Sequence, residues 1–168
     1  MKLEPLVEMP NNGSGIWRRF AVHMFEGHLS IDDMARVENV GVQWLKQNPG
    51  KLVEMVVIYP SDSVGMTSEE RSRMGRLIKR WEDVRVASAT VILASGIMGS
   101  VQRSVLTGLQ AIARPPHPTK VFSTRAEGVG WLMPYVQEAC GRDANRDDLV
   151  AAVEELSARF TARARDRG

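Results

Sequence analysis

Apolar and polar positions along this chain follow two rhythms, one typical of strands and one typical of helices. In residues 16–27, apolar side chains fall at every second position, which predicts one extended strand. After Ser30, which can cap a helix, apolar residues recur every three or four positions until Asn48–Gly50. We therefore expect a helix there, followed by a buried strand over 51–59.

The same alternation continues through the rest of the chain. The expected elements are a charged helix over 67–84, an almost wholly apolar strand over 87–95, a helix over 97–114, a short strand over 120–124, and helices over 124–140 and 145–168. Proline lacks an amide proton, so Pro134 is expected to interrupt or kink its helix. The pattern predicts an α/β fold with one mostly parallel sheet of four to five strands and helices packed on it.

The ends of the chain are expected to differ from this central unit. Residues 1–15 should form a flexible head or an edge strand, because Asn11–Gly15 has the composition of a turn. Residues 16–140 should form the α/β domain, and 141–168 an added amphipathic helix. The apolar stripe of that helix comprises Leu149, Val153, Leu156 and Phe160. It must pack either on this domain or on a second copy, in which case the protein would be a homodimer.

Composition limits the kinds of partner and the cellular compartment that we expect for this chain. A chain of 168 residues with 43% hydrophobic residues can bury a core without cross-links. The net charge of +2 is too small to indicate nucleic acid or a membrane as the partner. Cys140 is the single cysteine, which favours a reducing compartment. No apolar run is long enough to span a bilayer and no signal peptide is recognisable, so we expect a cytoplasmic, bacterial-type protein.

Familiar catalytic and metal-binding patterns are not found in the sequence. His23, His28 and His117 lack the spacing of metal ligands, and Cys140 has no histidine near it in sequence. No G-x-S-x-G motif occurs. We therefore expect no enzyme activity, no metal and no cofactor.

One candidate site is the serine-rich turn between the strand at 51–59 and the next helix. Thr67 and Glu70 have the spacing of a capping box, in which each side chain satisfies a backbone donor at the helix start. This favours a structural role for the turn, with partner binding or modification as the alternative. The candidates for contact or modification are Ser63, Thr67, Ser68, Arg71 and Arg76.

A second candidate site follows the apolar strand at 87–95. Glycines there would let a ligand approach the backbone closely, and no carboxylate occupies the first turn of the next helix. The candidates for binding an anion or another small ligand are Ser95, Gly96, Gly99, Ser100 and Arg103. The pattern matches neither G-x-G-x-x-G nor a phosphate-binding loop, so close packing of helix on sheet is the alternative.

Several segments taken together resemble one known family. They are FEGHLSIDDM, VQWLKQNPG, LVEMVVIYP, ATVILAS and, near the end, KVFSTRAEGVGWL. Their order and spacing over roughly 16–138 resemble the STAS/SpoIIAA-like superfamily, whose members resemble anti-sigma-factor antagonists. The resemblance implies a small domain that acts by binding a protein partner. In the antagonists, the second serine of Asp-Ser-Ser-Gly is phosphorylated to release that partner, whereas Val64 holds this position here.

The favoured hypothesis is a non-enzymatic regulatory or adaptor domain without the usual phosphoacceptor. The alternative is a carrier of a small molecule, lipid or phosphate ligand, or a weak enzyme, that uses the turn at 95–103. Arginines in the last helix could touch a membrane surface, but a solvated helix end is the favoured interpretation.

Overall fold

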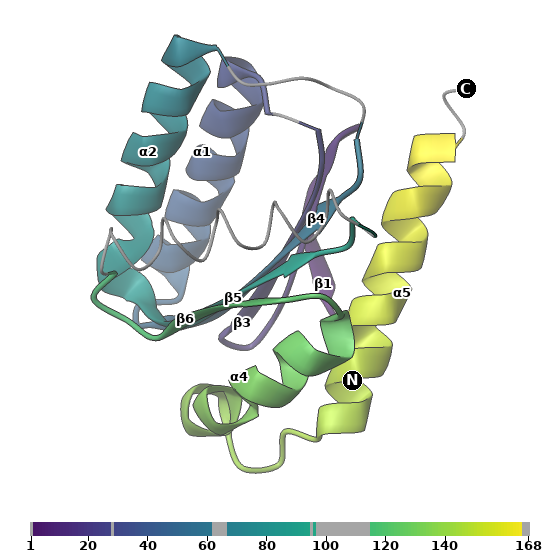
Figure 1. Ribbon diagram of the computed structural model, residues 1–168. Helices are drawn as coiled ribbons and strands as arrows, with labels where there is room; N and C mark the ends of the chain where they lie inside the picture. The colour runs from purple at the N-terminus through teal and green to yellow at the C-terminus, as the bar shows by residue number, and fades with distance from the viewer. Residues whose placement is uncertain (1, 28, 62–66, 95, 97–114, 166–168) are drawn as a thin grey trace.

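A computed structural model describes residues 2–27, 29–61, 67–94, 96 and 115–165 (Figure 1). Its strands are β1 (Glu4–Glu8), β2 (Asn12–Trp17), β3 (Phe20–Glu26), β4 (Leu52–Tyr59), β5 (Arg85–Ile92) and β6 (Thr119–Phe122). Its helices are α1 (Ile31–Gln47), α2 (Ser68–Trp81), α4 (Arg125–Cys140) and α5 (Arg146–Arg165), with a short 3-10 helix at Glu82–Val84. The helix expected over 97–114 lies outside the described residues.

Within these residues the strands form one sheet in the order β1-β2-β3-β4-β5-β6. The first three strands pair antiparallel, and β3 to β6 pair parallel. The expected α/β class is confirmed. The described sheet has six strands rather than four or five, and the extra strands come from the head of the chain.

The single strand expected over 16–27 is wrong, because the chain reverses between β2 and β3. Trp17 pairs with Phe20 across a two-residue turn, in which Arg18 takes a left-handed conformation with φ of 51°. Such turns need positive φ and are usually recognised by glycine or asparagine, which this one lacks. Its sequence therefore resembles a continuing strand.

Of the two alternatives expected for residues 1–15, the edge strand is the one described, because β1 lies at one edge of the sheet. The turn-like composition of Asn11–Gly15 is misleading, because most of that segment belongs to β2. A Cβ atom on Gly13 would lie 3.1 Å from the Phe160 ring, and one on Gly15 would lie 3.1 Å from Leu156. These glycines therefore allow α5 to approach the sheet closely.

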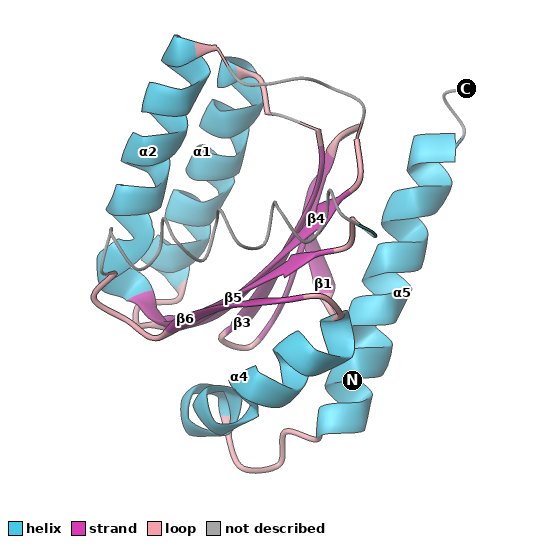
Figure 2. Cartoon of the chain, viewed as in Figure 1, coloured by secondary structure: helices cyan, strands magenta, loops and turns pink. Residues whose placement is uncertain are grey.

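Helices cover the sheet on both faces, α1 and α2 on one and α4 and α5 on the other (Figures 1 and 2). The face under α4 and α5 is wholly apolar over the central strands. Its fully buried residues are Phe20, Val22, Met24, Val53, Met55, Val57, Ala87, Ala89 and Val91. The stripe of α5 expected to be apolar packs into this same core, so it is used within the chain and not between copies.

Helices α1 and α2 form a pair with a smaller core of their own. Met34 and Leu77 are buried between them, and a Cβ atom on Gly41 would lie 3.0 Å from the Trp81 ring. Glu38 of α1 is buried and forms ion pairs with Arg73 and Arg80 of α2. These two arginines therefore hold the helix pair together.

Helix α4 runs through Pro134 without the interruption expected from the sequence. Proline at this position removes the amide that would bond to the carbonyl of Gly130. The face of α4 that contains Val129, Leu132 and Val136 is buried against the sheet. This burial stabilises the helix despite the missing hydrogen bond.

Candidate functional site

The sheet face toward α1 and α2 contains a row of polar side chains across four neighbouring strands. Ser14 of β2 lies opposite His23 of β3, and Glu54 of β4 lies opposite Ser88 of β5. Ser14, Glu54 and Ser88 are all buried. Because buried polar groups need partners, such a row is stable only as a connected network.

Glu54 is the centre of this network. Arg85 places its Nη2 atom 2.9 Å from Oε1 and its Nε atom 2.8 Å from Oε2 of the carboxylate. Ser88 donates its hydroxyl to Oε2 at 3.0 Å. On the other side, His23 Nε2 lies 3.8 Å from Oε1, and His23 Nδ1 lies 2.9 Å from Ser14 Oγ. The carboxylate thus accepts hydrogen bonds from β5 and faces the imidazole ring of β3 on its other side.

The pKa values of His23 and Glu54 are both lower than usual, for different reasons. Burial lowers the pKa of His23; Glu54 opposes this shift and Arg85 adds to it. Burial alone would raise the pKa of Glu54, but the charges of Arg85 and His23 and the hydrogen bond from Ser88 together lower it. At neutral pH we therefore expect a charged Glu54–Arg85 pair beside a neutral His23.

His117 lies beside this network, just before β6. It is 9% exposed, and its buried Nδ1 atom has no hydrogen-bond partner. Burial and the charge of Arg85 lower its pKa. One buried histidine, His117, and one partly buried histidine, His23, therefore lie near one ion pair.

The sequence of contacts Ser14–His23–Glu54 resembles that of nucleophile, base and acid in hydrolases. However, Ser14 is only 1% exposed, so its hydroxyl does not meet solvent or a substrate. Each member also sits mid-strand and joins neighbouring strands. We interpret the row as a structural network that fixes the register of the sheet.

The two turns singled out from the sequence follow the carboxyl ends of two parallel strands, β4 and β5. The amide of Leu93 donates to the carbonyl of Ile58 at 3.0 Å, so the chain leaves β4 and β5 at the same edge. Thr67 caps α2 and forms the expected capping box with Glu70, with hydrogen bonds of 3.1 and 2.8 Å. The structural role predicted for Thr67 is confirmed, and Ser63 lies outside the described residues.

The second site expected at this edge is described at one position only. Ser95, Gly99, Ser100 and Arg103 lie outside the described residues. Gly96 has a φ of 65°, which favours glycine, and a Cβ atom there would meet no atom within 4 Å. The ligand site at 95–103 therefore stays a prediction from the sequence.

On the α5 side of this edge, two polar pairs join α5 to the rest of the domain. The hydroxyl of Tyr59 forms a hydrogen bond with that of Ser157. Arg125, in the first turn of α4, binds Glu154 with two bonds of 2.8 and 2.7 Å. These pairs hold α5 in place at the edge of the sheet.

The outer face of α2 presents the expected Arg71 and Arg76 to solvent, together with Lys79. Ile78 of the same helix is 47% exposed, although it belongs to the same apolar stripe as Leu77 and Trp81. A Cβ atom on Gly75 would meet nothing within 4 Å, so this part of the helix stands open. We call Arg71, Gly75, Arg76, Ile78 and Lys79 the α2 surface.

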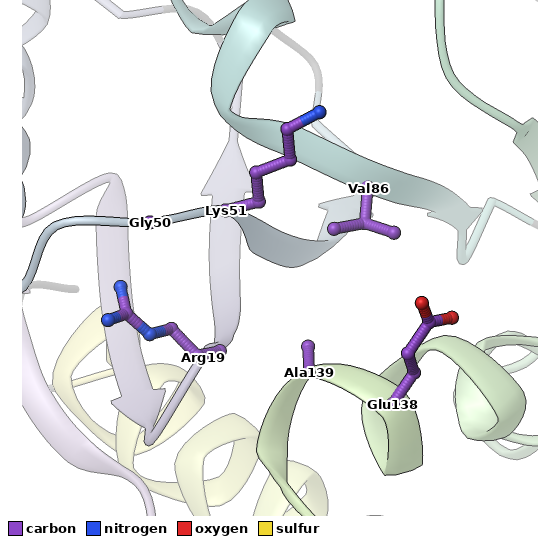
Figure 3. A pocket seen from close by; sticks show the side chains of 6 residues that line it. All are labelled: Arg19, Gly50, Lys51, Val86, Glu138 and Ala139. Atoms are coloured by element: carbon purple, nitrogen blue, oxygen red, sulfur yellow. The ribbon is translucent and has the colours of Figure 1, made fainter.

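A hollow of about 240 Å³ lies at the opposite, amino-terminal ends of β4 and β5 (Figure 3). It is lined by Arg19, Gly50, Lys51, Val86, Glu138 and Ala139. The two terminal nitrogens of Arg19 donate to the carbonyls of Asn48 at 2.7 Å and Pro49 at 2.6 Å, so Arg19 holds the turn before β4. Ligands of open α/β sheets favour the carboxyl ends of strands, and this hollow lies at the other end.

Comparison with family models, with curated proteins and with solved structures found no match for this chain. Among the helices described, none is long and apolar enough to cross a membrane. The described residues also contain no group of three histidine, cysteine or acidic side chains placed to hold a metal ion.

The polar row was not expected from the sequence. A signal was present in the strands themselves, because Glu54 interrupts an apolar run and Ser88 and Thr90 alternate with alanine and valine. Polar residues at every second position of neighbouring strands indicate one polar face. Their pairing, however, depends on strand register, which the sequence alone does not reveal.

Proposed function

We propose that this chain is a non-enzymatic regulatory or adaptor domain of STAS/SpoIIAA-like type, which binds an acidic protein partner through the α2 surface. The observation that carries the proposal is that one helix, α2, has three exposed cations and an exposed Ile78 along its solvent side. Exposed cations favour a partner of opposite charge, and an exposed apolar side chain adds a contact that becomes buried on binding.

The charges of α2 are divided between two roles. Arg73 and Arg80 are held by Glu38, so they stabilise the pair of helices. Arg71, Arg76 and Lys79 are exposed and give the α2 surface a positive charge. Complementary charge accelerates association and selects an acidic partner over a basic one.

Control by phosphorylation at the usual position is not part of the proposal. Valine stands at position 64, and the first amides of α2 already bond to its own capping box through Thr67 and Glu70. A phosphate there would have to displace the carboxylate of Glu70. We therefore propose that binding depends on shape and charge.

Photo-crosslinking in the native host tests the proposal directly. A benzoylphenylalanine in place of Gly75, where the space is open, should cross-link an acidic protein that mass spectrometry identifies. Replacing both Arg71 and Arg76 by alanine should then weaken binding of that purified protein by about five- to thirtyfold, from the loss of two contacts of about 0.5–1 kcal/mol each.

The matched control removes two positive charges elsewhere. Lys46 and Arg142 are exposed on other parts of the domain, and their double replacement by alanine should leave affinity unchanged. Equal affinities for the two double variants would exclude the α2 surface. Recovery of nucleic acid or anionic lipid in place of a protein would refute the proposed class of partner.

A further inference from the structure

Among the described residues, no strand pairs with the outer edge of β6. β6 is the last strand of the sheet and pairs with β5. The amide of Ser88 donates to the carbonyl of Pro118 at 3.0 Å. Because the bonding direction alternates along a strand, Lys120 also faces β5, while the backbone groups of Thr119 and Val121 point away from the sheet.

A row of aromatic side chains lies along this edge on the α4 side. The rings of Phe122 and Trp131 are 5.7 Å apart, and those of Trp131 and Tyr135 are 5.4 Å apart. All three are partly exposed. The ammonium group of Lys120 lies over the Phe122 ring, 5.5 Å from its centre. Large aromatic residues are the most frequent anchors of protein interfaces.

The two outer edges of the described sheet differ in how they are protected. β1 contains Pro5, which lacks a donor, and its register shifts between Pro5 and Val7. It also has exposed glutamates at Glu4 and Glu8. Such features prevent edge-to-edge pairing. β6 is shorter, but it contains no proline and its pairing with β5 shows no register shift; its one charged side chain, Lys120, lies over the Phe122 ring.

We propose that β6 pairs antiparallel with β6 of a second copy, about a two-fold axis at Val121. In this register Val121 lies opposite Val121 of the second copy. The amide of each Val121 then donates to the carbonyl of the other. It also places Lys120 opposite Phe122 of the second copy, on the face where both copies have their aromatic row. The contact is self-complementary, as a two-fold interface requires.

The charge of Lys120 selects this register over its neighbour. An axis at Lys120 would put two ammonium groups opposite each other, which is unfavourable. An axis at Val121 instead brings each ammonium group, which already lies over Phe122 of its own chain, next to the Phe122 ring of the other copy. The expected occupant of the edge is therefore a second copy of this chain. This surface is separate from the α2 surface, so the dimer could keep both partner sites open.

Sedimentation equilibrium of the full chain, from about 10 µM to about 1 mM, tests the pairing. The wild type should dimerise. Val121→Pro removes the outward donor but none of the bonds to β5, and proline is tolerated on an outer strand. This variant should be monomeric with an unchanged circular dichroism spectrum, whereas Val121→Thr, which keeps the donor, should dimerise. Lys120→Ala should weaken association by about five- to thirtyfold, because two cation–π contacts are lost.

Hydrogen exchange gives a measurement that needs no variant. The Val121 amide should become more protected as concentration rises, while the Lys120 amide, which faces β5, should not change. A wild type that stays monomeric, a dimer that survives Val121→Pro, or protection of Val121 that is independent of concentration would each overturn the proposal.

Discussion

Replacing Glu54 by glutamine should destabilise the domain strongly, although it changes a single atom. The substitution removes the negative charge and leaves Arg85 charged against a neutral amide. The side chains of Glu54 and Arg85 are each 11% exposed, so solvent screens the remaining charge poorly. Removing one partner of a buried ion pair typically costs about 3–5 kcal/mol.

The structure suggests that Glu54→Gln costs an amount near the lower end of this range. Glutamine keeps an oxygen that can accept the hydrogen bond from Ser88, so part of the network survives. We therefore expect a loss of about 3 kcal/mol in the free energy of unfolding. For a chain of this length, that loss corresponds to a fall of about 6–12 °C in melting temperature.

Urea unfolding followed by circular dichroism measures this loss, and two matched variants interpret it. Glu154→Gln breaks the ion pair with Arg125, in which Glu154 is 47% exposed, and should cost at most about 1 kcal/mol. The double variant Glu54→Leu with Arg85→Met removes both charges and should be more stable than Glu54→Gln. If Glu54→Gln costs no more than Glu154→Gln, the polar row is not a buried charge network and our interpretation is refuted.

Three further outcomes are expected. Because burial lowers the pKa of His23 in the folded state, the unfolded chain binds more protons as pH falls below about 6.5. Unfolding free energy should therefore decline from pH 7 to pH 5.5, and less so in His23→Gln; parallel pH profiles would contradict this. Gly128→Val should cost about 1–3 kcal/mol in urea unfolding, because a Cβ atom there already lies 3.0 Å from a core methyl group, and Gly130→Ala should cost less. Tyr59→Phe leaves the buried hydroxyl of Ser157 without this partner and should cost about 1–3 kcal/mol; an unchanged melting temperature would show that the contact is not important.

The alternation of strands and helices could be predicted from the sequence because each element has its own local signal. Ser30 and Thr67 cap helices where expected, and the small and β-branched residues of β5 mark a buried strand. The hairpin between β2 and β3 could not be predicted in this way. Arg18 adopts its left-handed conformation in a turn without glycine, and nothing in the local composition indicates the reversal.

The polar row across β2 to β5 was harder to predict, because it depends on which strands are neighbours in the sheet. Ser14, His23, Glu54 and Ser88 are distributed over 75 positions, and only the register of the sheet brings them together. Arg71 and Arg76, by contrast, were recognisable because a charged helix face needs no tertiary information. Glu38 shows the limit of that reasoning, because it binds Arg73 and Arg80, which nothing in the sequence of α2 distinguishes from its other arginines.

The contact between the first strand and the last helix has a consequence for how this domain is made. Arg163 binds Glu8 at 3.1 Å, and Leu3 is buried in the same core as Phe160. During synthesis, the apolar side of β1 therefore stays exposed until α5, near the end of the chain, has been translated. Until then the incomplete sheet exposes an apolar surface through which nascent chains can aggregate. We therefore expect efficient folding to depend on chaperones that bind this surface during translation.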